Sequence, residues 1–494
     1  MIGERNTKWA MERSMGIMMH VSCLPSQQGI GCFNEMAFRF VDFLTKSGMS
    51  YWQICPLSPT GYGDSPYQGT SAFAINPYFL NLEILGIKHI PSDLSQQPHR
   101  VSFGKLYKYF NNLLENFDSL WIRTLGKDAK FLEFQQAQAH WLKPYALFTA
   151  LKHFFKGKAW FEWPQEYRIY KKINTLKLPD IVVKYCEYHE ILQYILHIQW
   201  QKIKHYANRY HIKMIGDVPI YPGLDSAEVW SEPKNFQLDD QLQPKKVAGV
   251  PPDYFSPEGQ LWGNPIYDWK FLEKNQYDWW QQRIRRNREL FDILRLDHFR
   301  GFDRFWAVPA GAKNAINGKW EAGPREKLFD FFKNDEFIAE DLGDIDGSAR
   351  QLQQNLNFPG MRVLQFAFSG DPKNIYLPHC HTQNTVLYLG THDNDTLQGW
   401  YAKLDDRTKD QIRRYFGIND GEFAWKFLTE IYRSPCFLSV ICVQDLLGLG
   451  SEARFNTPGT KGNNWQWRMT KEQLVHLETS VAETLNAYKI LYDR

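Results

Sequence analysis

The stretch DILRLDH (292–298) is a short apolar run that ends on charged and polar side chains, and it decides how the chain folds. Its apolar residues do not alternate strictly with polar ones, as they do in a strand with one face in water. Such a run is typical of a parallel strand that is buried on both faces. Seven similar runs recur along the chain: GIMMHV (16–21), YWQICPL (51–57), KMIGDVPI (213–220), EFIAEDLG (336–343), MRVLQFAF (361–368), TVLYLGTHD (385–393) and FLSVICVQD (437–445).

Segments with helical spacing separate several of these runs. Examples are residues 36–48, 279–291 and 421–432, in which apolar side chains recur every three or four positions. Eight strand–helix units predict an α/β fold of the (β/α)8 TIM-barrel type, in which chemistry takes place at the C-terminal ends of the strands. We therefore interpret residues 1–494 as a single (β/α)8 catalytic domain.

Two spacings between runs are too long for a simple strand–helix unit. Residues 61–212 contain helix-like segments at 131–155 and 188–210, which predicts a mostly helical insertion within the barrel. Residues 223–278 carry GVPPDYFSPEGQLWGNP (249–265), which is rich in proline, glycine and aromatic residues. This composition suits an ordered functional loop, so we expect an active-site lid loop there.

Composition excludes several classes of partner. The 58 Lys and Arg residues balance 55 Asp and Glu residues to a formal net charge of +3, with no long run of one sign, so we expect no nucleic-acid partner. No segment approaches about 20 consecutive apolar residues, and the amino terminus does not resemble a signal peptide, so we expect no membrane association. Seven scattered cysteines without a CxxC pair indicate reduced thiols in a cytoplasmic protein.

Carboxylates and histidines fall at the ends of the predicted strands. Burying a carboxylate that has no function costs free energy, so carboxylates at several strand ends indicate a functional site. The residues in question are His20, Asp217, Asp297, Glu340, Asp393 and Asp445. Breaking and remaking a glycosidic bond with retention needs two carboxyls about 5–5.5 Å apart, and Asp297 and Glu340 form the best pair. For His20 and Asp445 we favour a structural hydrogen-bonding role.

Two further features accompany this pair. Arg295 lies two residues before Asp297, so the period of the strand directs both side chains to one side, where the arginine favours the ionised form of Asp297. The segment LGTHDNDT (389–396) brings His392 and Asp393 to another strand end, where Asp393 could stabilise a cation-like transition state. Two other readings stay open: a metal site at 389–396, and a purely structural salt bridge of Asp297 with Arg295 or Arg300.

Longer motifs resemble those of a known family. They run in the same order over nearly the whole chain: TGYGDSPYQGTSAFAINPY (60–78), GDVPIYP (216–222), PPDYFSPEGQLWGNPIYDW (251–269), RLDHFRGFDRFWAVP (295–309), AEDLG (339–343), THDNDT (391–396) and RFNTPGT (454–460). Together they resemble the amylomaltases, or disproportionating enzymes, which are the 4-α-glucanotransferases of glycoside hydrolase family 77.

The resemblance implies a barrel with insertions that moves segments of α-1,4-glucan from a donor to the 4-hydroxyl of an acceptor glucan or glucose. It assigns Asp297 as nucleophile, Glu340 as acid/base and Asp393 as stabiliser of the transition state. The other residues that it implies are substrate-binding: Tyr62, Asp217, Arg295 and His392 around the sugar at the cleavage point, and Asp253, Gln260 and Trp262 on the lid-like loop. It implies no metal and no organic cofactor, and we expect a monomer or a weak homo-oligomer.

Two positions depart from the family pattern. Cys32 and Cys380 stand where the family usually has Asp and Asn, which affects local turns but leaves the three carboxylates in place. Two other functions remain open from the sequence. One is an α-glucan hydrolase, which differs mainly in what its acceptor subsites admit. The other is a catalytically inactive glucan-binding protein on the same scaffold, since a fold does not fix a function.

Overall fold

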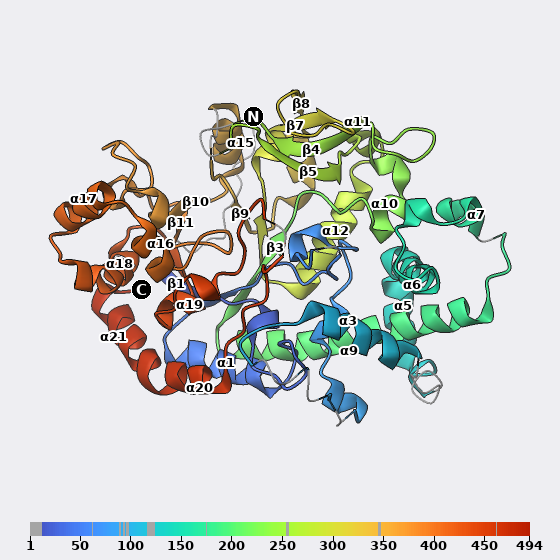
Figure 1. Ribbon diagram of the computed structural model, residues 1–494, viewed down its shortest axis with the longest axis horizontal. Helices are drawn as coiled ribbons and strands as arrows, with labels where there is room; N and C mark the ends of the chain where they lie inside the picture. Colours follow the sequence, from blue (N-terminus) through green and yellow to red (C-terminus); the bar gives the residue numbers. More distant parts are fainter. Residues whose placement is uncertain are drawn as a thin grey trace.

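Eight parallel strands form the centre of the molecule (Figure 1). The computed structural model describes residues 12–494 except 62, 88–89, 92–93, 95–97, 116–123, 174, 253–255, 344–346 and 461. The strands follow the order β10-β11-β12-β1-β2-β3-β6-β9. Their bounds are β1 Ser14–Met18, β2 Tyr51–Gln53, β3 Lys213–Val218, β6 Ile293–Leu296, β9 Phe337–Ala339, β10 Gly360–Val363, β11 Thr385–Tyr388 and β12 Leu438–Cys442.

Each of the eight predicted runs contains or overlaps one of these strands. The two edges of the sheet approach one another, because the Ala339 amide at the end of β9 donates a hydrogen bond of 2.9 Å to the carbonyl of Pro359, next to β10. The sheet therefore curls into a nearly closed barrel, and the predicted (β/α)8 fold is confirmed.

The strands form where they do because nearly every residue in them is buried. All five residues of β12 and all four of β6 and β11 are buried, so both faces of these strands are covered. Inside the barrel, Arg295 and Asp217 lie opposite one another in the register of β6 and β3, which brings two charged groups together in the core. The barrel thus has a mostly apolar wall and charged side chains directed at its mouth.

Helices surround the sheet and cover its outer face. Helix α1 begins after Asn34, whose side chain accepts a hydrogen bond from the Met36 amide, which satisfies one of the free amides at the helix start. The helices with eight or more residues in the barrel portion are α1 Glu35–Lys46, α12 Asp278–Leu290, α15 Gly347–Leu356, α17 Asp406–Phe416, α18 Phe423–Arg433 and α21 Ala482–Tyr492.

Residues between β2 and β3 form a mostly helical region on one side of the barrel (Figure 1). Its longer helices are α3 Phe103–Glu115, α5 Ala129–Ala137, α6 Ala139–Phe154 and the 30-residue α9 Asp180–Arg209. Helix α9 is anchored to the barrel by Trp200, whose indole donates to the carbonyl of Leu290 at 2.8 Å.

Part of the region predicted as a lid loop is strand, namely residues 249–250 and 260–265. Strands β4 (Lys246–Val250) and β5 (Gln260–Pro265) pair in antiparallel fashion, and β4 also pairs with β7 (Arg304–Pro309), which pairs with β8 (Lys319–Ala322). Gln260 and Trp262 therefore lie on a strand and not on a loop. The placement of these two residues on a loop was wrong because the partner strand β7 comes some sixty residues after β4, and proline and glycine mask the strand pattern of β4 and β5.

All seven cysteines lie within the described residues, and all are free thiols. No helix in the described part of the chain combines the length and the apolar character needed to span a bilayer.

Candidate active site

Asp297 and Glu340 stand side by side at the C-terminal ends of β6 and β9. The last residues paired in this part of the sheet are Leu296 and Ala339, and the two acids follow them directly. The Glu340 amide donates to the Leu296 carbonyl at 3.1 Å, and the Asp297 amide donates to Val218 at 3.1 Å, so both backbones remain in the sheet. Since neighbouring strands lie about 4.8 Å apart, the two carboxyls face the same barrel mouth from adjacent strands.

Glu340 is held in a setting that favours its protonated form. Its two carboxylate oxygens accept hydrogen bonds from the amides of His298 at 2.8 Å and Leu342 at 2.9 Å. Burial raises the pKa of Glu340 to about 7, and the negative charge of Asp297 adds to this, whereas Arg295 and the two amides oppose it. A carboxyl with a pKa near neutrality can donate a proton and later accept one.

Arg295 joins the nucleophile candidate to a second acid. As the period of the strand predicts, its Nη1 donates to Asp297 Oδ1 at 2.9 Å, and the same nitrogen lies 2.7 Å from both oxygens of Asp217. The side chains of Arg295 and Asp217 are almost completely buried. Burial raises the pKa of Asp217, while the charge of Arg295 opposes that shift. One guanidinium group therefore holds two carboxylates in fixed positions.

Asp393 and His392 lie on the turn that follows β11. Burial works to raise the pKa of Asp393, but the charge of His392 and hydrogen bonds from His392 and Asn456 lower it to about 2. Asp393 Oδ2 lies 3.4 Å from His392 Nε2, and Asp393 Oδ1 accepts from Asn456 Nδ2 at 2.6 Å. The Asp393 side chain is nearly half exposed to solvent, although protein atoms surround it closely enough for burial to act on its pKa.

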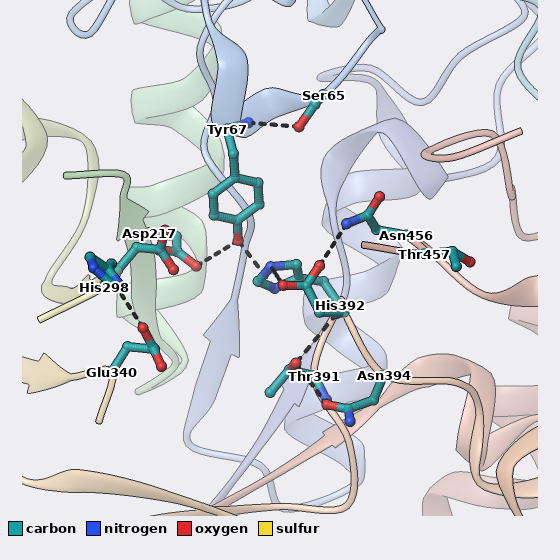
Figure 2. A network of polar contacts seen from close by, with 12 residues as sticks. Ser65, Tyr67, Asp217, His298, Glu340, Thr391, His392, Asn394, Asn456 and Thr457 are labelled. Carbon is teal, nitrogen blue, oxygen red and sulfur yellow. Dashed lines mark hydrogen bonds and ion pairs between the residues drawn. The ribbon is translucent and has the colours of Figure 1, made fainter. Parts of the chain in front are cut away.

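Tyr67 connects the two halves of the site (Figure 2). Its hydroxyl donates to Asp217 Oδ2 at 2.8 Å and lies 3.1 Å from His392 Nδ1, and its ring stacks on the imidazole with centroids 4.6 Å apart. Neither Tyr67 nor Asn456 was predicted as a site residue. They lie in the motifs SPYQG and RFNTPGT, but neither follows a strand, so no strand end indicates their position.

Trp262 reaches the site from the antiparallel sheet. Its ring and the ring of His298 form an edge-to-face contact with centroids 4.7 Å apart, and His298 directly follows Asp297. The Trp262 indole also donates to Gln260 Oε1 at 3.1 Å. The other two predicted binding residues, Tyr62 and Asp253, lie outside the described residues.

The remaining candidates have local roles. His20 packs edge-on against Phe79, and burial followed by the nearby charge of His392 lowers its pKa to about 3. Asp445 accepts a hydrogen bond of 2.7 Å from the amide of Leu397, the first residue of helix α16 (Leu397–Lys403). The Arg300 guanidinium lies over the Trp320 ring at 4.0 Å. No group of three or more potential metal-binding side chains occurs among the residues that the structure describes.

The two cysteines that depart from the family pattern lie near turns. Cys32 is buried just before α1, with its sulfur 3.6 Å from Ser26 Oγ, and burial raises its pKa to about 12. Cys380 ends the short 3-10 helix Pro378–Cys380 and is partly buried.

Comparison with known proteins agrees with this geometry. The sequence profile of glycoside hydrolase family 77, described as 4-alpha-glucanotransferase, matches residues 19–474. A 4-alpha-glucanotransferase from Clostridium butyricum is 43% identical over 468 residues, which cover 91% of this chain and 95% of that protein. One from Streptococcus pneumoniae is 41% identical over 481 residues, 94% of each chain.

A solved structure supports the same relationship. The amylomaltase from Streptococcus agalactiae, determined in complex with acarbose, has a TM-score of 0.90 and 36% identity to this chain. The match covers 98% of this chain and 100% of that one, so the barrel and both additional regions have counterparts there. Profile, sequence identity and fold agree over almost the whole length, and the chain belongs to the 4-alpha-glucanotransferases of glycoside hydrolase family 77.

Proposed function

We propose that this 4-alpha-glucanotransferase disproportionates α-1,4-glucans by a retaining double displacement, with Asp297 as nucleophile and Glu340 as acid/base. The observation that carries this proposal is the pair of carboxyls on adjacent strand ends, together with the burial that raises the pKa of Glu340 to about 7. A retaining reaction needs this combination of a carboxylate and a carboxylic acid about 5–5.5 Å apart.

In the first step, the Asp297 carboxylate attacks the anomeric carbon of the glucosyl unit at the cleavage point. The bond from that carbon to the glycosidic oxygen breaks, and Glu340 gives its proton to the departing 4-oxygen. The transition state carries positive charge on the sugar ring, which the Asp393 carboxylate at the barrel mouth stabilises. The product is a glycosyl ester on Asp297 and a shortened glucan.

In the second step, the 4-hydroxyl of an acceptor replaces the ester. Glu340, now ionised, removes the proton from that hydroxyl while its oxygen attacks the anomeric carbon and the bond to Asp297 breaks. The ester carries no negative charge, so the contribution of Asp297 to the raised pKa of Glu340 disappears during this step. The same carboxyl thus changes from acid to base between the two steps.

The surrounding residues fit substrate binding. Arg295 contacts both Asp297 and Asp217, and Tyr67 joins Asp217 to His392. Trp262 on β5 contacts His298, the residue that follows Asp297. We assign Gln260, Tyr62 and Asp253 to the same glucan site from the family resemblance. An aromatic face near the nucleophile favours a bound sugar acceptor over water, which separates transfer from hydrolysis.

The cellular setting follows from composition. Seven free thiols, five of them buried, suit a reducing compartment, and we propose a cytoplasmic enzyme. We also propose a monomer or a weak homo-oligomer, because the carboxyl pair, Arg295 and Asp393 all come from one chain.

Incubation with maltotriose tests the proposed activity. We expect glucose together with a ladder of longer maltodextrins, measured by anion-exchange chromatography. Glucose and maltose alone would show a hydrolase, and no product at any pH would show a binding protein. Asp297→Asn, which nearly preserves the shape of the side chain, should abolish the ladder while maltotriose binding measured by calorimetry persists.

The covalent step has a test of its own. Glu340→Gln slows both steps with natural donors, but a maltosyl fluoride donor needs no proton for its leaving group. We expect this variant to accumulate a glycosyl-enzyme that mass spectrometry of proteolytic peptides locates at Asp297. An adduct at another residue, or none while fluoride is released, would contradict the assignment of the nucleophile.

A further inference from the structure

A continuous series of contacts crosses the barrel mouth from β6 to the turn after β11. It runs from Asp297 through Arg295, Asp217, Tyr67 and His392 to Asp393, and each link is a hydrogen bond or an ion pair between 2.7 and 3.4 Å. Strands β6 and β11 are not neighbours in the sheet, so the backbone does not connect these acids directly. Tyr67 is the link between the two sides (Figure 2).

The position of Tyr67 is set by its own short segment. It lies in the 3-10 helix Pro66–Gln68, where the Ser65 hydroxyl accepts from the Tyr67 amide at 3.3 Å. Ser58 in turn donates to the carbonyl of Pro66 at 2.8 Å. The Tyr67 ring is packed against the rings of His392 and Trp465. These contacts fix the ring plane, so the hydroxyl oxygen is directed into the gap between Asp217 and His392.

Counting protons along this series fixes the state of His392. Both oxygens of Asp217 accept hydrogen bonds from Arg295, whose positive charge opposes the effect of burial and favours the ionised carboxylate, and an ionised carboxylate only accepts hydrogen bonds. The single proton of the Tyr67 hydroxyl is therefore donated to Asp217, and its oxygen can only accept from His392. Nδ1 of His392 must then carry a hydrogen, which leaves Nε2 to face the Asp393 carboxylate.

A neutral imidazole with hydrogen on Nδ1 would present a lone pair of Nε2 to a carboxylate. A second proton on Nε2 turns this repulsion into an ion pair, so the arrangement favours the imidazolium form. The charge of Asp393 and its hydrogen bond raise the pKa of His392 in spite of burial, which agrees with this reasoning. The titratable or charged groups that face His392 from the surrounding elements are His20, Tyr67, Asp217, Arg295 and Asp393.

We infer that Tyr67 is a positioning residue whose hydroxyl keeps His392 oriented and doubly protonated toward Asp393. This inference rests on the roles proposed above for Asp297 and Asp393. The hydroxyl would then have a structural effect as well as an electrostatic one. It would hold Asp393 at a fixed position relative to Asp297, although the strands that carry these two residues are not neighbours. The Trp465 ring packs against the rings of both Tyr67 and His392 and helps to fix their positions.

Tyr67→Phe tests the inference, because phenylalanine keeps the stacked ring and removes only the hydroxyl. Without the acceptor at Nδ1, His392 can place its single proton on Nε2 and donate to Asp393 as a neutral ring. We therefore expect the pKa of His392, measured by NMR on protein with isotope-labelled histidine, to fall in the variant. The His392→Gln spectrum identifies the resonance. An unchanged pKa of His392 would overturn the inference.

Kinetics supply a second readout. We expect kcat for maltotriose to fall about tenfold, in the range of a lost hydrogen bond to a charged group, with KM within about twofold. In a His392→Gln background, Tyr67→Phe should have almost no further effect, because the residue through which it acts is already gone. Independent, multiplying losses in the double variant would contradict an action through His392.

Tyr145→Phe is a matched control. Tyr145 is a buried tyrosine on α6 whose hydroxyl accepts from Gln193 Nε2 at 3.5 Å, away from the barrel mouth. It should leave kcat and the pKa of His392 unchanged, and an equal fall in kcat would show a general packing effect and overturn the inference. Failure of the proposed function can be distinguished from failure of this inference, because in that case the wild-type protein would make no ladder of longer glucans.

Discussion

Neutralising Asp297 should lower the pKa of Glu340, because the negative charge of Asp297 is one cause of its raised value. Asp297→Asn removes that charge and keeps nearly the same shape. The protonated form of Glu340 then loses its advantage over the ionised form. The change also imitates the charge that Asp297 would have in the proposed glycosyl-enzyme.

The size of the effect follows from the separation that a retaining pair of carboxyls requires. At a separation of about 5 Å and an effective dielectric constant of about 20, two unit charges interact with about 3 kcal/mol. Because about 1.4 kcal/mol corresponds to one pKa unit, the pKa of Glu340 should fall by about two units. A value of about 7 in the wild-type protein thus becomes one near the ordinary value for glutamate.

The measurement is a carbon NMR titration of protein with isotope-labelled glutamate carboxyls, and it does not depend on turnover. Glu340→Gln, made in both backgrounds, identifies the Glu340 resonance. Asp445→Asn is a control, because it neutralises a different strand-end carboxylate that is no cause of the Glu340 shift. An unchanged titration of Glu340 in Asp297→Asn would refute the electrostatic coupling of the pair.

Three other variants address the surroundings of the site. Asn456→Ala removes the 2.6 Å hydrogen bond to Asp393 and should lower kcat/KM for maltotriose about tenfold, and wild-type kinetics would contradict its role. Gly216→Ala puts a Cβ 2.1 Å from the Phe291 ring and should lower stability by about 1–3 kcal/mol in a thermal melt, whereas Gly104→Ala, which meets no atom within 4 Å, should not. Burial raises the pKa of Asp445 to about 7, so the folded state holds this proton more tightly than the unfolded state and stability is lost as pH rises toward 7. Asp445→Asn should therefore raise Tm at pH 8 and leave it nearly unchanged at pH 4. An equal change in Tm at the two pH values would show that ionisation of Asp445 is not the cause.

The sequence predicts the barrel well because parallel strands are covered on both faces. Such strands require apolar runs, and runs like FLSVICVQD (437–445) are visible without any knowledge of their neighbours. Asp297 and Glu340 could be placed at the same end of the barrel for a similar reason. Each follows the end of an apolar run, and β6 and β9 run in the same direction.

Features that depend on distant partners were not predictable in this way. Strand β4 is defined by pairing with β7, and its pattern of partly exposed residues carries little hydrophobic signal. Tyr67 and Asn456 come from segments that no periodicity places, and their roles follow from contacts across 325 and 63 residues. Only coordinates reveal that these two side chains lie against the His392–Asp393 turn.

The charges at the barrel mouth explain why so many acids can share one small space. Arg295 lies within 2.9 Å of Asp217 and Asp297, and His392 lies 3.4 Å from Asp393, while burial raises the pKa of Glu340. Acidic side chains grouped in this way suit a sugar ring that becomes positive in the transition state. Without Asp217, the guanidinium group would be freer to turn toward Glu340, whose pKa its charge already lowers. We therefore expect Asp217 to hold Arg295 beside Asp297 and to help keep the pKa of Glu340 raised.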